Sequence, residues 1–154
     1  MDTLKVLSEW NRSLAGVIGA IGTDDFFPKL IAAVQQRVPI AYPQVWLYHR
    51  ELPPRVLYHE IPPEAVKTQV DSYLDGPYQE DPFYQTSVNR PRNRIYRLSR
   101  VTSGRLEQSD YYRDYYSDTG TVDEAIFLSQ LKGGNVINLS MLRLPTQGSY
   151  TDDE

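Results

Sequence analysis

Residues 109–144 read SDYYRDYYSDTGTVDEAIFLSQLKGGNVINLSMLRL, and this stretch decides the fold. Its first part begins at Ser109, a residue type that often caps helices, and contains Tyr112, Tyr115 and Tyr116. Positions i, i+3 and i+4 lie on the same side of an α-helix. The spacing therefore predicts a helix from Ser109 to Tyr116 with one aromatic face.

Two apolar runs follow this helix, at residues 125–131 and 136–144. The breaker Asp118-Thr119-Gly120 separates them from the helix, and Lys132-Gly133-Gly134-Asn135 lies between them. Glycines can take the positive φ angles that a tight turn between antiparallel strands requires. The pattern therefore predicts a β-hairpin.

The last four residues, Thr151-Asp152-Asp153-Glu154, have the pattern of a capping box, with threonine and glutamate three positions apart. This pattern is typical of a helix N-terminus. We therefore expect the chain to be one domain of a longer protein in which a further element follows.

The composition limits the class of protein. With 154 residues, 40% of them apolar, the chain can form one domain with an ordinary core. It has no cysteine, which excludes disulfides, thiol catalysis and thiolate metal sites and suits a reducing cytoplasm. Neither an apolar run of membrane-helix length nor a secretory signal is present in the sequence. The net charge of -4 disfavours nucleic-acid binding by this segment alone.

The content of twelve tyrosines, beside two tryptophans and four phenylalanines, is unusual. A tyrosine offers apolar area and one hydroxyl, so a pocket rich in tyrosine can hold an apolar group and hydrogen-bond a polar end. The alternative is that these rings are ordinary half-buried packing residues.

The N-terminal residues 2–21 have the pattern of an amphipathic helix with a 3.5-residue repeat. The repeat positions hold Leu4, Leu7, Asn11, Leu14, Ile18 and Ile21. A single asparagine among leucines and isoleucines fixes register in paired helices, which favours a parallel homodimer. The same stripe would also suit a helix packed on the domain's own sheet.

The remaining elements complete an α+β pattern. We expect helices and strands alternating in short runs: a helix at 25–38, strands at 44–49 and 55–61, helices at 63–74 and 82–88, and a strand at 94–98. Strands joined by hairpins, with helices between them, predict an antiparallel β-sheet sandwiched by helices, as in GAF/PAS-like sensor domains.

The sequence holds no pattern of an enzyme, a metal site or a cofactor site. His49 and His59 could face each other across the first hairpin, but two imidazoles without a third ligand make a poor metal site. No serine lies in a nucleophile elbow, and no glycine-rich phosphate loop is present. The carboxylates of Asp110, Asp114 and Asp118 recur along one helix side, where they more often face water or arginines.

Asp123 and Glu124 stand where a loop enters the otherwise apolar strand at 125–131. One of these acids could point into a pocket and accept a ligand amine or hydroxyl. Alternatively, both terminate the turn after Gly120, because a buried acid needs a partner.

Several segments, in their order along the chain, resemble the N-terminal sensor region of LuxR-type transcriptional regulators. The segments are Ile21-Gly22-Thr23-Asp24-Asp25-Phe26-Phe27, Pro53-Pro54-Arg55-Val56-Leu57-Tyr58, Tyr73-Leu74-Asp75-Gly76-Pro77-Tyr78, Asp81-Pro82-Phe83-Tyr84, Tyr111-Tyr112-Arg113-Asp114-Tyr115-Tyr116 and Asp123-Glu124. The resemblance covers nearly the whole chain. It implies an antiparallel sheet with helices on both faces, a cavity between the sheet and one helical layer, dimerisation, and a C-terminal helix-turn-helix domain that is absent here.

Autoinducer receptors related to this family hold an acyl-homoserine lactone with a tryptophan, a tyrosine and an aspartate before a proline. Trp46, Tyr78 and Asp81-Pro82 look similar to this set. Asp81 before Pro82 also has the pattern of a helix N-cap followed by its first residue.

Together these features predict a ligand-sensing domain of a bacterial transcription factor, in residues 1–154, that binds a partly apolar small-molecule effector. The ligand-binding candidates are Trp46, Tyr48, Tyr58, Tyr78, Asp81, Tyr84, Tyr96, Tyr112 and Phe127. The alternative is a ligand-free module that serves dimerisation through the N-terminal helix. Neither hypothesis requires a cofactor, a metal or a membrane.

Overall fold

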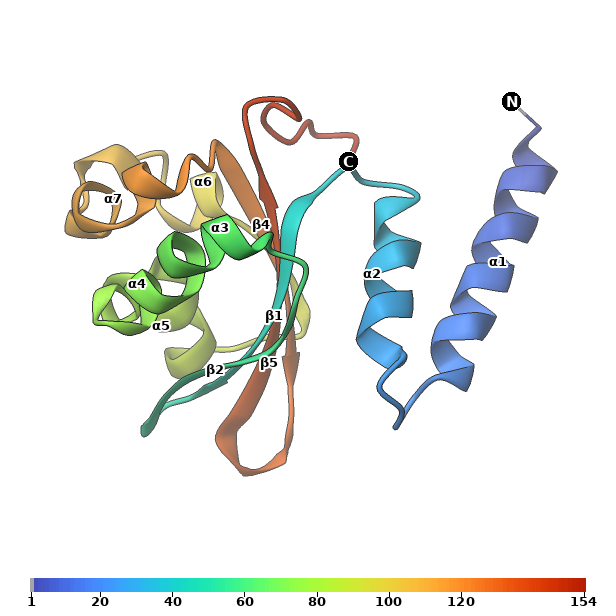
Figure 1. Cartoon of the computed structure of the whole chain (residues 1–154), viewed down its shortest axis with the longest axis horizontal. Coiled ribbons are helices and arrows are strands. Elements are labelled where there is room, and N and C mark those ends of the chain that lie inside the picture. Colours follow the sequence, from blue (N-terminus) through green and yellow to red (C-terminus); the bar gives the residue numbers. More distant parts are fainter. Residues whose placement is uncertain (1) are drawn as a thin grey trace. The chain divides into compact units, whose positions relative to one another are not determined.

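The computed structural model describes residues 2–154, which form two compact units (Figure 1). The helical-hairpin unit ends at Pro39, and the sheet unit comprises Ile40–Glu154. Of the helices formed by residues 2–154, none is long and apolar enough to span a lipid bilayer.

The helical-hairpin unit consists of α1 (Thr3–Gly19) and α2 (Phe26–Gln35). The Asp2 side chain caps α1 by accepting a hydrogen bond from the Leu4 amide at 3.0 Å. Two polar contacts join the helices: Ser13 Oγ donates to Gln36 Oε1 at 2.9 Å, and the Arg37 guanidinium donates to the Val6 carbonyl at 2.8 Å.

The predicted seam of α1 is separate from these contacts. Leu14 is half-buried, whereas Asn11 and the four terminal apolar residues of the seam are exposed, with Leu4 at 76% and Ile18 at 67%. Their predicted role in pairing with a second chain stays a prediction.

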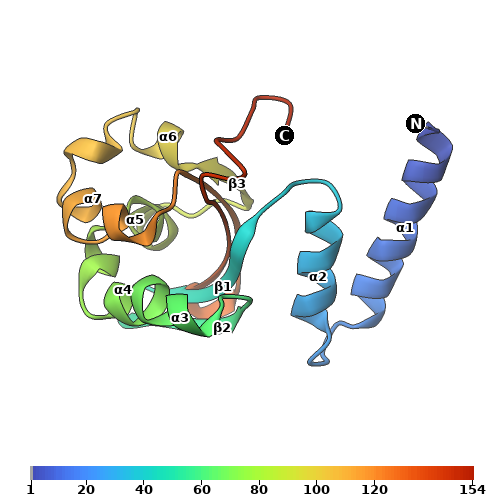
Figure 2. The same cartoon turned by 45° about the horizontal axis from the view of Figure 1, so that its top comes forward.

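The sheet unit is built on five strands: β1 (Ala41–His49), β2 (Leu52–His59), β3 (Arg94–Arg97), β4 (Asp123–Gln130) and β5 (Asn135–Arg143). They pair only in antiparallel fashion, in the order β2-β1-β5-β4-β3. The sheet curves around a helical layer (Figures 1 and 2). The predicted α+β fold, an antiparallel sheet packed with helices, is confirmed.

The helical layer comes from residues 63–119 and contains α3 (Pro63–Val66), α4 (Ser72–Leu74), α5 (Pro82–Asn89), α6 (Leu98–Val101) and α7 (Asp110–Asp114). The predicted helix at 63–74 is present, but its middle, Lys67–Asp71, is a π-helical turn. The short 3-10 segments are Pro77–Glu80, Leu106–Gln108, Tyr116–Thr119 and Lys132–Gly134. Residues Leu98–Val101 form α6, a helix that the sequence did not predict.

One local prediction is wrong, and one possibility that the sequence left open is excluded. The tyrosine helix ends at Asp114, because Tyr115 takes φ -144° and ψ -61°, so Tyr112 does not share a helix face with Tyr115 and Tyr116. His49 and His59 do not face each other, because the register of the first hairpin pairs His49 with Leu52 and places His59 opposite Gln44.

The second hairpin agrees with its prediction. Its turn places Gly133 and Gly134 at φ 72° and 77°, a conformation that glycine adopts without steric cost.

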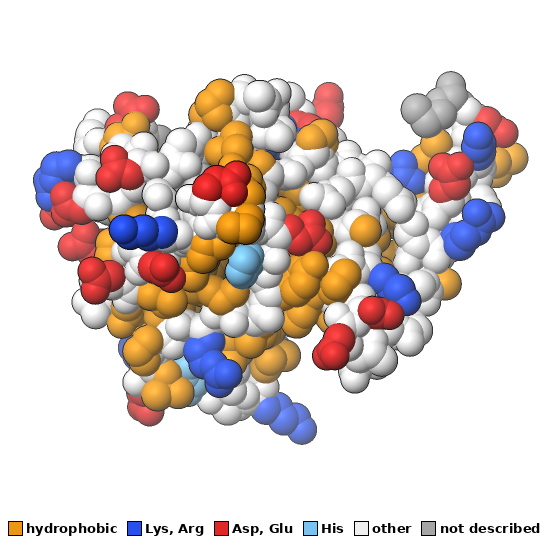
Figure 3. All heavy atoms as spheres, in the orientation of Figure 1, with side chains coloured by type: hydrophobic (Ala, Val, Ile, Leu, Met, Phe, Trp, Pro, Cys, Tyr) orange, Lys and Arg blue, Asp and Glu red, His pale blue; other side chains and the backbone are white. Residues whose placement is uncertain are grey.

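On the molecular face drawn in Figure 3, acidic and basic side chains are interspersed.

Candidate functional site: a polar cavity between sheet and helices

A small cavity lies in the sheet unit, between the sheet and the helical layer. Its volume is about 30 Å³, room for about two water molecules. The lining residues come from strands β1, β4 and β5 and from the helical segments around the π-helical turn and α7: Gln44, Trp46, Tyr48, Gln69, Tyr73, Asp81, Tyr111, Tyr115, Tyr116, Thr119, Thr121, Glu124, Ser140 and Leu142. Most of these side chains carry a polar atom, and none of them is cationic.

A chain of hydrogen bonds runs from the sheet to the start of α5. The hydroxyls of Tyr48 and Tyr73 lie 3.0 Å apart, and Tyr73 donates to Asp81 Oδ2 at 2.6 Å. Because the single proton of Tyr73 goes to Asp81, Tyr48 is the donor in the first bond. Asp81 Oδ1 also accepts from the Phe83 amide at 2.8 Å and so caps α5. The predicted N-cap is therefore confirmed.

Asp81 is only 4% exposed to solvent. Burial raises its pKa to about 6, although the hydrogen bonds from Tyr73 and the Phe83 amide act in the opposite direction. Burial and the charge of Asp81 also raise the pKa of Tyr73 and Tyr48 well above the usual value. Both hydroxyls therefore keep their protons at neutral pH and remain donors.

A second acid, Glu124, enters the cavity from β4. Its carboxyl accepts a hydrogen bond from Ser140 Oγ on the neighbouring strand at 2.6 Å. Burial first, and then the charge of Asp81, raise the pKa of Glu124 to about 8. Within residues 2–154, no cationic group forms an ion pair with either acid.

The π-helical turn supplies the polar groups on the opposite wall. Gln69 is buried, its carbonyl accepts from the Tyr115 hydroxyl at 2.8 Å, and its side-chain amide donates to the Thr119 carbonyl at 3.0 Å. A π-helical turn breaks the regular i to i+4 bonding, and such turns recur at functional sites. Here it ties the helix at 63–74 to the segment after α7.

Tyr116 stands at the boundary of this cavity. It is 3% exposed, and its hydroxyl has no hydrogen-bond partner within the described residues 2–154. Tyr116 and Thr121 also line a neighbouring open groove of about 480 Å³. The groove is bounded by α6, the start of α7 and the beginning of β4, and its lining includes Leu98, Leu106, Tyr112 and Val122. Tyr116 and Thr121 thus line both the cavity and the groove.

Comparison with known proteins gives a consistent result at the level of structure. No protein-family model and no curated protein sequence matches the chain. Among solved structures, the ligand-binding domain of VqsR from Pseudomonas aeruginosa superposes with a TM-score of 0.70 and 26% identity, covering 87% of this chain and 79% of that one. The chain has the fold of LuxR-type ligand-binding domains. The predicted resemblance is thereby confirmed.

More distant LuxR-type structures agree on the fold. The N-acylhomoserine lactone-dependent LuxR-family transcription factor CepR2 from Burkholderia cenocepacia matches with a TM-score of 0.68 and 17% identity, over 96% of this chain and 82% of that one. Escherichia coli SdiA matches with a TM-score of 0.60 and 16% identity, over 95% of this chain and 59% of its own. SdiA has also been solved in complex with octanoyl-rac-glycerol. The LuxR-type neighbours thus include transcription factors and ligand-binding domains.

The structure brings some of the predicted ligand-binding residues together and not others. Trp46, Tyr48 and Asp81 line the cavity. Tyr78 and Tyr84 pack beside it, with ring centroids 5.3 Å apart, and Tyr84 lies 5.3 Å from Tyr48.

Besides Tyr78 and Tyr84, four further predicted contacts lie outside the cavity lining. Tyr112 lines the neighbouring groove instead. Tyr58 donates to Glu60, Tyr96 lies under the guanidinium of Arg94, and Phe127 is 42% exposed. Phe127 is outside because side chains alternate along β4, so that the buried positions are Ile126 and Leu128.

The sequence prediction missed several residues that line the cavity. Those missed are Gln44, Gln69, Tyr73, Tyr111, Tyr115, Tyr116, Thr119, Thr121, Ser140 and Leu142. The tyrosine-rich segment was a usable signal for three of them. The buried glutamines and Ser140 gave no signal, since nothing in the local pattern separates them from surface residues.

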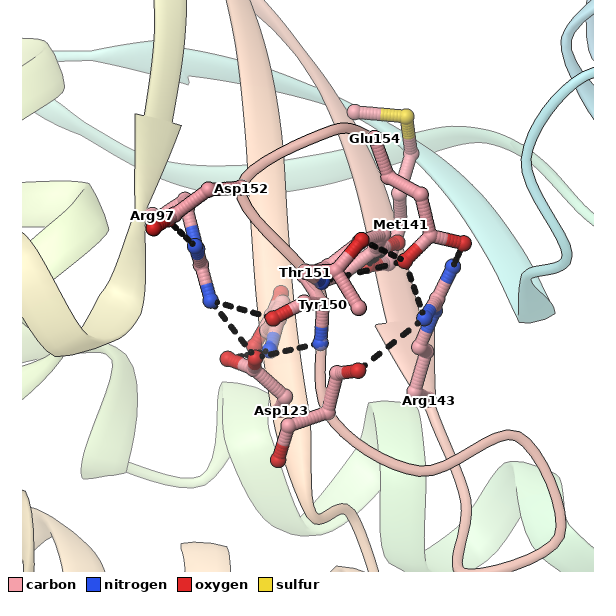
Figure 4. A network of polar contacts seen from close by, with 10 residues as sticks. Arg97, Asp123, Met141, Arg143, Tyr150, Thr151, Asp152 and Glu154 are labelled. Carbon is pink, nitrogen blue, oxygen red and sulfur yellow. Dashed lines mark hydrogen bonds and ion pairs between the residues drawn. The ribbon is translucent and has the colours of Figure 1, made fainter.

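Asp123 lies beside Glu124 but serves a different contact (Figure 4). Its carboxylate accepts from the Tyr150 amide at 2.9 Å and pairs with Arg97 at 3.4 Å. Arg97 also pairs with Asp152 at 3.3 Å. These bonds hold the C-terminal segment against the ends of β3 and β4.

Glu154 completes this network (Figure 4). Its carboxylate pairs with the buried Arg143 at 2.8 Å and accepts from the Thr151 amide at 3.0 Å. The second bond is the glutamate half of the predicted capping box. Arg143 also lies 3.8 Å over the ring of Tyr150. The side-chain bond to Arg143 lowers the pKa of Glu154 to about 2.

Proposed function

We propose that the sheet unit is the small-molecule-sensing part of a LuxR-type transcriptional regulator. The ligand would occupy the polar cavity and extend past Tyr116 into the neighbouring groove. Such a regulator has to reach DNA, so we place it in the bacterial cytoplasm. DNA contact would belong to a separate C-terminal helix-turn-helix domain, since the net charge here is -4.

The observation that carries this proposal is the polar lining of a cavity inside the core. Two carboxyl groups, Asp81 and Glu124, share that space without a cation, and the Tyr116 hydroxyl has no partner in residues 2–154. Burying acids and unpaired hydroxyls lowers stability, whereas an apolar core of the same volume would not. Perturbed acids of this kind cluster at functional sites.

Native mass spectrometry of the freshly purified 154-residue chain tests the proposal. We expect a non-covalent small-molecule adduct that is lost on denaturation. Ser140→Leu would fill the cavity with a larger side chain and should abolish the adduct. Ser129→Leu is the matched control on β4, because Ser129 lines neither the cavity nor the groove. An adduct that persists in Ser140→Leu would place the ligand elsewhere.

One observation favours a second function, a ligand-free dimerisation module. The cavity of about 30 Å³ is far smaller than the 300–1,000 Å³ of typical ligand pockets. A wild-type chain without any adduct, purified from its own bacterial host, would support this second function over ligand sensing.

We further propose that α1 pairs with α1 of a second chain through its 3.5-residue repeat. Four apolar residues of this repeat, Leu4, Leu7, Ile18 and Ile21, are exposed by half or more, which suits a partner helix. A ligand would then act by favouring one arrangement of the pair.

Sedimentation velocity tests the pairing. Leu7→Asp places a charge in the repeat and should convert a dimer into a monomer. Ser8→Asp adds the same charge at an exposed position outside the repeat and should leave the dimer intact. Identical sedimentation of both variants and the wild type would exclude α1 as the dimer contact.

A further inference from the structure

The cavity is lined by two acidic side chains and by no cationic one. Asp81 comes from the start of α5 and Glu124 from β4, and both line one space of about 30 Å³. No lysine, arginine or histidine lines it, so ionisation of both acids would leave two negative charges, a buried one on Asp81 and a half-buried one on Glu124, without compensation.

The two acids differ in how many hydrogen bonds their carboxyl oxygens accept. Asp81 accepts from Tyr73 and from the Phe83 amide, so both of its oxygens are engaged. Glu124 accepts from Ser140 alone among the residues of the described chain. A carboxylate has about four acceptor positions, so Glu124 retains room for donors from a ligand.

An unsatisfied donor-acceptor group points to the same space. The Tyr116 hydroxyl is buried without a partner within residues 2–154, and Tyr116 lines the cavity that holds Glu124. Burial first, and then the charge of Glu124, raise the pKa of Tyr116, which keeps this hydroxyl protonated. Tyr116 can therefore hydrogen-bond a molecule in the cavity.

We propose that the cavity holds the cationic end of an amine between the Asp81 and Glu124 carboxylates, with the remainder of the molecule in the groove past Tyr116. This proposal rests on the proposed sensing function and specifies its ligand class. An ammonium group has three donors and one positive charge and fits a space of two water molecules. Leu98, Leu106 and Tyr112 in the groove would contact an apolar tail.

Isothermal titration calorimetry with three probes of equal length tests the charge requirement: n-butylammonium, n-butyrate and n-butanol. The full chain at pH 7.5 and fixed ionic strength should bind the ammonium ion at least tenfold more tightly than either of the others. Binding of butyrate or butanol with equal or higher affinity would overturn the amine assignment while leaving ligand sensing in place. Failure of all three probes to bind would overturn the assignment as well.

Two variants test the role of Glu124. Glu124→Gln keeps the shape and an acceptor for Ser140 but removes the charge, and it should weaken n-butylammonium binding at least tenfold. Glu64→Gln removes an exposed charge from α3 and should bind like the wild type. Circular dichroism establishes that both variants are folded. Unchanged affinity in Glu124→Gln would overturn the proposal.

Proton release gives a readout that packing alone would not change. The pKa of Glu124 is raised to about 8, so part of the Glu124 population is protonated at pH 7.5 and a bound ammonium ion should expel that proton. Glu124 interacts electrostatically with the following ionisable groups, and each interaction raises the pKa of at least one partner: Asp81, Asp123, Tyr48, Tyr111, Tyr115, Tyr116 and Tyr150. Binding enthalpies in phosphate and Tris should therefore differ for the wild type and agree for Glu124→Gln. Equal enthalpies for the wild type in both buffers would contradict the proposal.

Discussion

Replacing Glu124 by glutamine should stabilise the ligand-free protein, and the gain should grow with pH. Glutamine is neutral at every pH and can still accept the hydrogen bond from Ser140. Glutamate is neutral only while protonated. Above its pKa, the folded protein has to hold a second negative charge beside Asp81 in a cavity without a cation.

The sign of the effect follows from the raised pKa. The folded state holds the Glu124 proton more tightly than the unfolded chain, so the contribution to stability is fully present below pH 4.5 and is lost as pH rises through about 8. At 1.36 kcal/mol per pKa unit, the difference between 4.5 and about 8 corresponds to at most about 5 kcal/mol. Asp81, with a pKa of about 6, adds a smaller loss in the same direction at lower pH.

Urea unfolding followed by circular dichroism between pH 5 and pH 9 measures this effect. With a denaturant slope of about 2 kcal/mol/M, a gain of about 4 kcal/mol moves the midpoint by about 2 M. Glu124→Gln should unfold near the wild-type midpoint at pH 5 and well above it at pH 9. The exposed Glu64→Gln control should follow the wild type throughout. Parallel pH profiles for Glu124→Gln and the wild type would refute the reasoning.

Two further variants probe the hydrogen-bond chain and the C-terminal segment. Tyr73→Phe removes the hydroxyl that donates to Asp81 at 2.6 Å, so urea unfolding should show a loss of about 1.5–3 kcal/mol at pH 8 and a smaller loss at pH 4, where Asp81 is neutral. Glu154→Gln weakens the pair with the buried Arg143, so amide exchange of residues 150–152 should quicken. The exposed Asp153→Asn should leave that exchange unchanged, and faster exchange there as well would contradict the assignment.

Most of the fold follows from local sequence patterns. Hairpin glycines, N-caps and alternating apolar residues depend on nearest neighbours, so the strands, the second hairpin and the Ser109 and Asp81 caps could be predicted. The length of the tyrosine helix could not. It stops at Asp114 because Tyr115 leaves the helical conformation, and its hydroxyl bonds to the Gln69 carbonyl from a segment 46 residues away. Tertiary contacts of this kind override helical periodicity.

The residues of the cavity could likewise be predicted only where a local sequence pattern marks them. Trp46, Tyr48 and Asp81 could be predicted because an aromatic strand face and an Asp-Pro cap are visible in the sequence. Gln69 could not, since its position depends on a π-helical turn that no local pattern announces. Phe127 was predicted to line the cavity because it is apolar, like its buried neighbours Ile126 and Leu128. Its side chain instead points to the other side of the strand.

The position of Asp123 and Glu124 in a strand decides which of the two acids enters the cavity. The sequence allowed either acid to enter a pocket, or both to end a turn. Once residue 123 begins β4, successive side chains have to point to opposite faces of the sheet. Glu124 therefore enters the cavity, and Asp123 holds the Tyr150 amide at the other face. Two adjacent residues thus contact the cavity and the C-terminal segment, so a displacement of this end of β4 has to alter both.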